Sequence, residues 1–272
     1  MASAPNSLPI FYKDLMPLNV RDHAKWSVRQ SPTADWLIGQ HAVPLTVDEF
    51  ALAQRHYPIV FSAGENPVPL ALFGLNEGIN VYVDDKGVLE TDTLYIPAYA
   101  RRYPFILARI DPSNADNMTL CFDPTSGLLG EFKEGEALFD SEGGPSDHIK
   151  GMLKFCEDFE GAGQRTQFFM DEMKKNDLLI DGEVAISQDG LEQPFVYRGF
   201  QLINREKFSE LRGDLLRTWN QNGLLHIVHA HFLSLDLMRN IFARQTYQGK
   251  GPGGEAMKAK ADAEKAAKKT KK

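Results

Sequence analysis

The sequence predicts an α+β protein, in which an antiparallel, β-rich N-terminal half packs with a more helical C-terminal half. Three observations predict it. Short apolar runs bounded by turn-forming residues fill the stretch 58–122. Apolar residues recur at helical spacing after residue 146. The last residues are rich in Lys, Ala and Gly, a composition typical of a disordered basic tail.

These features predict one α+β domain over residues 1–245. Its β-rich part covers about 1–135 and its helical part about 146–245. The Lys/Ala-rich tail is predicted to be disordered over 246–272.

The strands of the first half are predicted from runs that are rich in β-branched and aromatic residues. Turn-forming clusters at 76–78 and 84–87 separate some of them. Before the first run, Thr46 can cap a helix in the segment 47–56. The predicted strands are 58–61, 68–73, 79–83, 105–110 and 118–122.

The second half begins with a helix that Ser146 or Asp147 can cap, since apolar residues then recur at i, i+3 and i+7. Gly161 and Gly163 are predicted to interrupt it before a second helical stretch. Two strand-like runs, an amphipathic helix and a last short helix after Ser234 complete the half. The two runs are 178–186 and 195–203, and the amphipathic helix carries Phe208, Leu211, Leu215 and Trp219.

Composition and charge restrict the class of protein. Hydrophobic residues make up 43% and charged residues 25%, which is typical of a soluble globular protein. No run approaches the ~18 apolar residues of a membrane span, and no secretion signal opens the chain, so a cytoplasmic protein without integral membrane association is expected. The tail from Lys250 carries a net charge of +5 and the rest −12, together −7. An acidic body repels phosphates and disfavours nucleic acid as a partner.

No motif identifies a reaction or a cofactor. The chain has no GxSxG elbow, phosphate-binding loop or dinucleotide fingerprint. Cys121 and Cys156 lie far apart and are expected to be free thiols.

A histidine cluster offers an enzymatic alternative. On a strand His229 and His231 would share a face, whereas on a helix His226 and His229 would be neighbours. His229 and His231, with carboxylates from elsewhere and with or without a metal, could serve an enzyme. The other interpretation is that these histidines are partly buried and hydrogen-bonded within the fold.

The segment YIPAYARRYPF offers a candidate binding surface. Pro97 suits the first turn of a short helix and Pro104 would end it, so Tyr99, Arg102 and Tyr103 fall on one face. Tyrosine and arginine side chains can hold a planar or anionic ligand or a protein partner. The alternative is that they pack between sheet and helices. The candidate residues are Tyr95, Tyr99, Arg101, Arg102 and Tyr103.

Several short motifs are spread along the chain: FYK at 11–13, LN at 18–19 with His23, HYPIVF at 56–61, YIPAY at 95–99, RRYPF at 101–105, AHF at 230–232 and SL at 234–235. In these motifs the chain resembles the SapC family of bacterial proteins. The resemblance covers roughly residues 10–245 and implies a role as an accessory of the surface layer or of secretion, with no catalytic residues to transfer. A membrane permease that shares the name is excluded, because this chain has no spanning segment.

The expected function is therefore that of a soluble, non-enzymatic accessory or binding protein that uses the aromatic–arginine surface. A protein or peptide is the expected partner, with a small molecule as the alternative. No cofactor is predicted.

Overall fold

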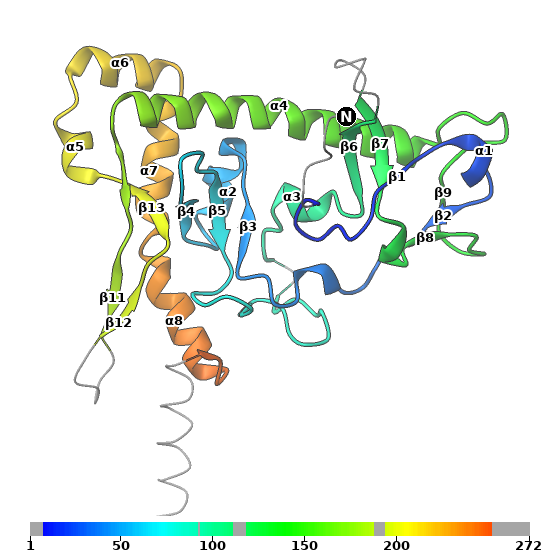
Figure 1. Ribbon diagram of the computed structural model, residues 1–272, viewed down its shortest axis with the longest axis horizontal. Coiled ribbons are helices and arrows are strands. Elements are labelled where there is room, and N and C mark those ends of the chain that lie inside the picture. Colours follow the sequence, from blue (N-terminus) through cyan, green and yellow to red (C-terminus); the bar gives the residue numbers. More distant parts are fainter. Residues whose placement is uncertain (1–7, 92, 111–117, 188–193, 252–272) are drawn as a thin grey trace, which may run out of the picture.

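The computed structural model describes residues 8–91, 93–110, 118–187 and 194–251 and confirms the α+β class (Figure 1). Its main sheet is antiparallel, with the strand order β10-β13-β4-β5-β3. Strands from both halves of the sequence pair in it, so the halves share one sheet. These strands are β3 (Ala42–Pro44), β4 (Ile59–Ser62), β5 (Pro69–Leu72), β10 (Leu179–Asp181) and β13 (Phe200–Ile203).

Smaller antiparallel sheets lie at the other end of the molecule and beside α8 (Figure 1). One has the order β1-β7-β6, another the order β8-β2-β9, and β11 pairs with β12 as a hairpin. These strands are β1 (Met16–Pro17), β2 (Ser27–Val28), β6 (Phe105–Arg109), β7 (Met118–Phe122), β8 (Leu129–Gly130), β9 (Glu136–Ala137), β11 (Val184–Ile186) and β12 (Phe195–Tyr197).

One long helix, α4 (Asp147–Lys175), runs along most of the longest dimension of the molecule (Figure 1). Ser146 caps it by accepting a hydrogen bond from the Ile149 amide, as its sequence predicts. The other helices are α1 (Val20–His23), α2 (Phe50–Ala53), α3 (Ala98–Arg101), α5 (Arg205–Ser209), α6 (Gly213–Gln221), α7 (Leu224–Ser234) and α8 (Leu237–Tyr247), with short 3-10 turns η1 (Asp35–Leu37), η2 (Val47–Glu49) and η3 (Pro124–Ser126).

Helix α4 covers two hydrophobic clusters. Its N-terminal part contributes Ile149 and Cys156 to a cluster with Phe105 and Phe122. Its C-terminal part contributes residues such as Phe169 to the main core under the five-stranded sheet. The helix is therefore the element that both clusters have in common.

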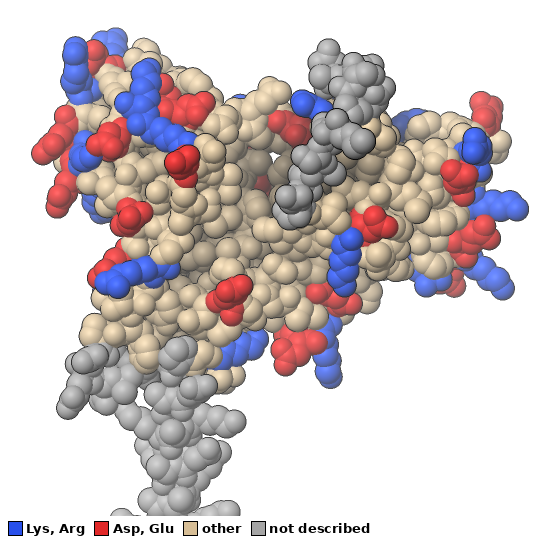
Figure 2. Space-filling model, in the orientation of Figure 1, with Lys and Arg blue, Asp and Glu red and all other residues tan. Residues whose placement is uncertain are grey.

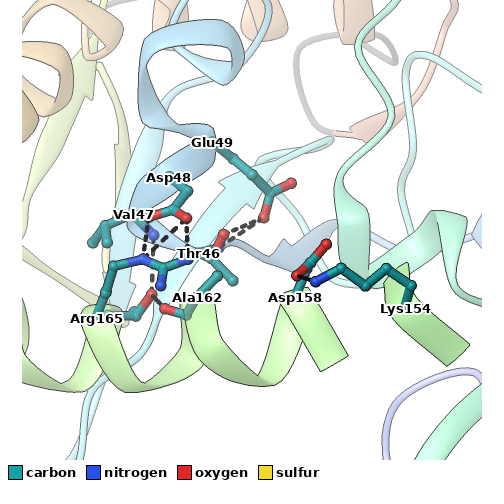
Figure 3. A network of polar contacts seen from close by, with 9 residues as sticks. Thr46, Val47, Asp48, Glu49, Lys154, Asp158, Ala162 and Arg165 are labelled. Atoms are coloured by element: carbon teal, nitrogen blue, oxygen red, sulfur yellow. Dashed lines mark hydrogen bonds and ion pairs between the residues drawn. The ribbon is translucent and has the colours of Figure 1, made fainter. Parts of the chain in front are cut away.

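Polar contacts fix α4 to η2 (Figure 3). Thr166 Oγ1 accepts from the Val47 amide at 3.0 Å and donates to the Ala162 carbonyl at 2.7 Å. Beside it, the Arg165 guanidinium pairs with both carboxylate oxygens of Asp48. Thr46 and Glu49 form the capping box that starts η2, which confirms Thr46 as a helix cap.

Several expected elements differ in the structure. Gly161 and Gly163 do not interrupt α4, because tertiary contacts on both sides of them outweigh the low helix propensity of glycine. The amphipathic helix expected over 208–219 is divided into α5 and α6. The run 79–83 forms only an isolated bridge from Val83 to Leu89.

The ordered fold also extends beyond residue 245. Helix α8 ends at Tyr247, and Lys250 Nζ donates to the Asn80 carbonyl at 2.8 Å. Residues 252–272, for which a disordered tail was predicted, lie outside the described residues.

Among the described helices, none combines the length and the apolar character that crossing a bilayer requires. Figure 2 shows acidic and basic side chains mixed at both ends of one face and a largely uncharged middle.

Candidate functional site

Helix α3 is held by a buried carboxylate. Glu49 Oε1 accepts from the Ala98 amide at 2.6 Å and from the Tyr95 hydroxyl at 2.9 Å. The Tyr57 hydroxyl donates to the Tyr95 carbonyl at 2.6 Å. These bonds fix the entry to the predicted aromatic–arginine segment, and a cis peptide bond between Tyr103 and Pro104 ends it.

Tyr99 and Arg102 face the interior. Only 5% of Arg102 is exposed, and its guanidinium lies 4.4 Å from the Tyr99 ring centroid and 4.3 Å from that of Phe159. The Glu160 carboxylate lies 3.6 Å from Nη1 of Arg102. Nε of Arg102 is buried and has no hydrogen-bond partner among the described residues. Burial raises the pKa of Tyr99. This pair of side chains stabilises the fold and is not open to a partner.

Arg101 and Tyr95 lie near each other and are less buried than Tyr99 and Arg102. The exposed guanidinium of Arg101 lies 5.2 Å from the Phe155 ring centroid and 5.7 Å from that of Tyr95. Burial, followed by the charge of Glu49, raises the pKa of the half-buried Tyr95. Arg101 is thus the accessible arginine of the two.

Tyr103 borders a cavity. Its ring centroid lies 5.1 Å from that of Trp36, and burial, then the carboxylate of Asp123, raises its pKa to about 12. A cavity of about 330 Å³ opens beside these rings, and we call it the Tyr103 cavity. Its apolar lining is Val28, Trp36, Tyr103, Pro104, Phe105, Leu128 and Met152, and its polar lining is Arg29, Gln30, Ser31, Glu136 and His148.

The structure therefore divides the five predicted residues. Tyr99 and Arg102 are buried, Arg101 lies beside Phe155 of α4 and the half-buried Tyr95, and only Tyr103 reaches this cavity. Helical spacing does place Tyr99 and Arg102 together, but that face meets the core. The interpretation that these rings pack inside is correct for Tyr99.

The other cavity residues were not predicted from the sequence. Arg29, Trp36 and His148 come from three distant segments, and the fold brings them together. Because these three residues do not share a sequence motif, no local pattern predicts that they lie together.

The three histidines separate on α7. His231 is fully buried: its Nδ1 donates to the Ile59 carbonyl at 2.8 Å and its Nε2 accepts from the Ile203 amide at 3.2 Å. Burial lowers its pKa to about 4. His226 and His229 are exposed, and the ring of His229 packs against Phe208.

The pair His229 and His231 therefore does not form a joint site, because a helix directs them to different surroundings. Within the described parts of the chain, no group of three or more His, Cys, Asp or Glu side chains could hold a metal ion.

The stretches that carry the family resemblance meet in the core. Ser234 Oγ accepts from the Ile59 amide at 2.9 Å, next to the bond from His231 to the same residue. The Tyr12 hydroxyl donates to the Phe105 carbonyl at 2.6 Å. These motifs therefore join segments that are far apart in the sequence, and their contacts are mainly internal.

The described residues define an α+β protein in which both halves of the sequence share one sheet and the Tyr103 cavity lies beside the Tyr103–Pro104 peptide bond. The chain belongs to the SapC family, whose model matches residues 18–241. Comparison with curated proteins finds no match, and neither does comparison with solved structures.

Proposed function

We propose that this member of the SapC family is a non-enzymatic accessory protein that binds a peptide or a partner protein at the Tyr103 cavity. The observation that carries the proposal is the cavity itself, which places Trp36, Tyr103, Pro104 and Phe105 around a space of about 330 Å³. That volume lies in the range of ligand sites and suits one inserted side chain. Tyr and Trp are favoured anchors of protein interfaces.

The proposal narrows the surface expected from the sequence. Arg102 is already enclosed by two rings and cannot pair with a partner's anion. Arg101 is exposed, but the described cavity does not include it. Recognition is therefore assigned to Tyr103 and its neighbours, with surface-layer assembly or secretion as the cellular setting that the family name suggests.

A larger cavity of about 400 Å³ lies beside Tyr82 and Lys250. Most of its polar side chains already have partners inside the protein. The Asp84 carboxylate accepts from the Lys86 and Val88 amides, and Lys250 Nζ donates to the Asn80 carbonyl. The Tyr103 cavity is preferred because the described structure shows no such internal partner for the side chains of Arg29 and His148.

No observation favours the enzymatic alternative, since His231 is committed to two backbone groups and His229 lies apart from it.

Photo-cross-linking in the native cells tests the proposal. A benzophenone amino acid replaces Gln30, an exposed residue that lines the cavity, and in a matched protein it replaces Lys207, an exposed residue of α5. We expect a protein adduct of defined mass from position 30 and not from position 207, identified by mass spectrometry.

The adduct should disappear when the cavity is altered by Trp36→Ala or, independently, by Met152→Lys, each checked for an unchanged far-UV spectrum. Adducts that are the same from both positions, or that persist in both folded variants, would exclude binding at this cavity.

A further inference from the structure

One polar residue that lines the Tyr103 cavity is a donor only. The Arg29 guanidinium can only donate, Gln30, Ser31 and His148 can donate or accept, and Glu136 is the one carboxylate among the lining residues. Arg29 is also the one arginine or lysine of the lining, so an acceptor that carries a negative charge is the group that it would bind.

Arg29 is held in place although the described residues give it no ion pair. Its backbone amide donates to the Leu128 carbonyl at 2.9 Å, which ties it to the strand edge. Its guanidinium lies 3.4 Å from the centroid of the Phe132 ring. A cation that stacks in this way keeps the N–H groups at its edge available for a second partner.

The ring beneath Arg29 is itself fixed. The Phe132 amide donates to the Gly130 carbonyl at 3.0 Å, and its carbonyl accepts from Ser27 Oγ at 3.3 Å. A Cβ atom at Gly130 would lie 3.1 Å from the Phe132 ring, so the absence of a side chain there leaves room for the ring. Arg29 is therefore preorganised, which reduces the entropy that a ligand must overcome to bind it.

The apolar wall gives the second half of the recognition. Trp36 and Tyr103 lie at a tilt of 33° with Pro104 and Phe105 beside them. The faces of these rings can take a flat or branched apolar group.

We infer that the Tyr103 cavity binds a carboxylate that carries an apolar body, with the carboxylate on Arg29 and the body against Trp36 and Tyr103. The inference rests on the proposed binding function and assigns the chemistry of its ligand. The same chemistry occurs in the C-terminal residue of a peptide and in a free aryl or alkyl carboxylate.

The test uses four probes: 3-phenylpropionate, its amide, N-acetyl-Gly-Gly-Phe with a free C-terminus, and the same peptide as its C-terminal amide. The full-length protein is labelled with 5-fluorotryptophan, and the fluorine signal of Trp36 is followed by NMR. The chain has three Trp residues, so Trp36→Phe assigns that signal.

We expect the acids to shift the Trp36 signal saturably and to bind at least about tenfold more tightly than the amides, as for one charge-assisted hydrogen-bonded pair. Arg29→Gln should bring the acid-to-amide ratio close to one. Lys133→Gln is the matched control, because it removes a positive charge next to Phe132, on which Arg29 stacks, but outside the cavity lining.

Glu136→Gln should change the affinity for the acids in the opposite direction to Arg29→Gln. Since it removes the one negative charge from the lining, 3-phenylpropionate should bind several-fold more tightly to it than to the wild type. If N-acetyl-Gly-Gly-Phe binds more tightly than 3-phenylpropionate, the site is assigned to a peptide C-terminus. If the two acids bind with equal affinity, the site is assigned to the small carboxylate.

Equal binding of acids and amides, no saturable shift with any probe, or an unchanged ratio in folded Arg29→Gln would overturn the carboxylate assignment. The binding function would survive that result if cross-links from position 30 still depended on Trp36. Loss of those cross-links, with acid-selective probe binding retained, would instead remove the protein partner and leave a small-molecule site.

Discussion

One imidazole takes the place of a backbone hydrogen bond between two strands. β13 pairs with β4 at Gln201 and Phe61, but at Ile59 and Ile203 the strands are bridged by His231, which contacts both. Because Nδ1 donates and Nε2 accepts, the neutral ring with its proton on Nδ1 satisfies both groups. His231 thus attaches α7 to the sheet, and its burial has an energetic consequence.

We predict that acid destabilises the protein through His231. Burial lowers the folded pKa to about 4, below the ordinary value of 6.5, so the unfolded chain binds the proton first. The contribution of His231 to the free energy of unfolding is complete above pH 6.5. It is lost as the pH falls toward 4, which lowers the free energy of unfolding by up to about 3 kcal/mol. Urea unfolding at a series of pH values measures it.

His231→Phe gives the matched comparison. It leaves the Ile59 carbonyl and the Ile203 amide without their partner, so stability at neutral pH should fall by about 2–5 kcal/mol and the acid-dependent loss should shrink. His229→Phe, at an exposed position of the same helix, should change stability by no more than about 0.5 kcal/mol. An acid-dependent loss that is unchanged in folded His231→Phe would contradict this role.

Among the elements, the four strands β4, β5, β6 and β7 were predictable from the sequence. Each is a short run rich in apolar residues with turn or loop residues nearby. Helix α7 was not assigned, because apolar residues surround its axis on most sides and give no clear period. The length of α4 was underestimated, since contacts from η2 outweigh the low helix propensity of Gly161 and Gly163.

The candidate site was predictable only in part. The spacing of Tyr99 and Arg102 in the sequence predicts that their side chains lie together, because it depends only on the local helix. The structure confirms this contact. Whether that face meets water depends on α4, whose Phe159 covers Arg102 from about sixty positions away in the sequence. The association of Tyr103 with Trp36 and Arg29 likewise depends on the complete fold.

The glycines of α4 lead to a prediction about this element. Gly163 is exposed, and nothing lies within 4 Å of a Cβ added there, so Gly163→Ala should raise the free energy of unfolding by about 0.5–1 kcal/mol. Thermal or urea unfolding measures the change.

Gly74→Ala is the contrasting variant. A Cβ at that buried position would lie 1.9 Å from the Ile79 carbonyl oxygen, so the backbone must move and stability should fall. No gain at position 163 would mean that the helix there is already as stable as alanine could make it, contrary to the propensity argument.

For the molecule as a whole, the question is whether the two hydrophobic clusters unfold together. Helix α4 has 29 residues and a length of about 43 Å, and it supplies buried side chains to both clusters. A helix of this length that loses its contacts at one end loses much of its stability along its length. We therefore predict one cooperative unfolding transition.

Two tryptophans report on the two clusters in a single sample. Trp26 packs against the cluster of Phe105 and Phe122, and Trp219 is fully buried in the main core. In protein labelled with 5-fluorotryptophan, the folded signals of both should decline at the same urea concentration, and the denaturation curve from circular dichroism should coincide with them. If Trp26 lost its folded signal at a clearly lower concentration, the N-terminal part of α4 would be an independent unit. The Tyr103 cavity, whose lining includes Met152 of that part, would then be able to open while the main core stays folded.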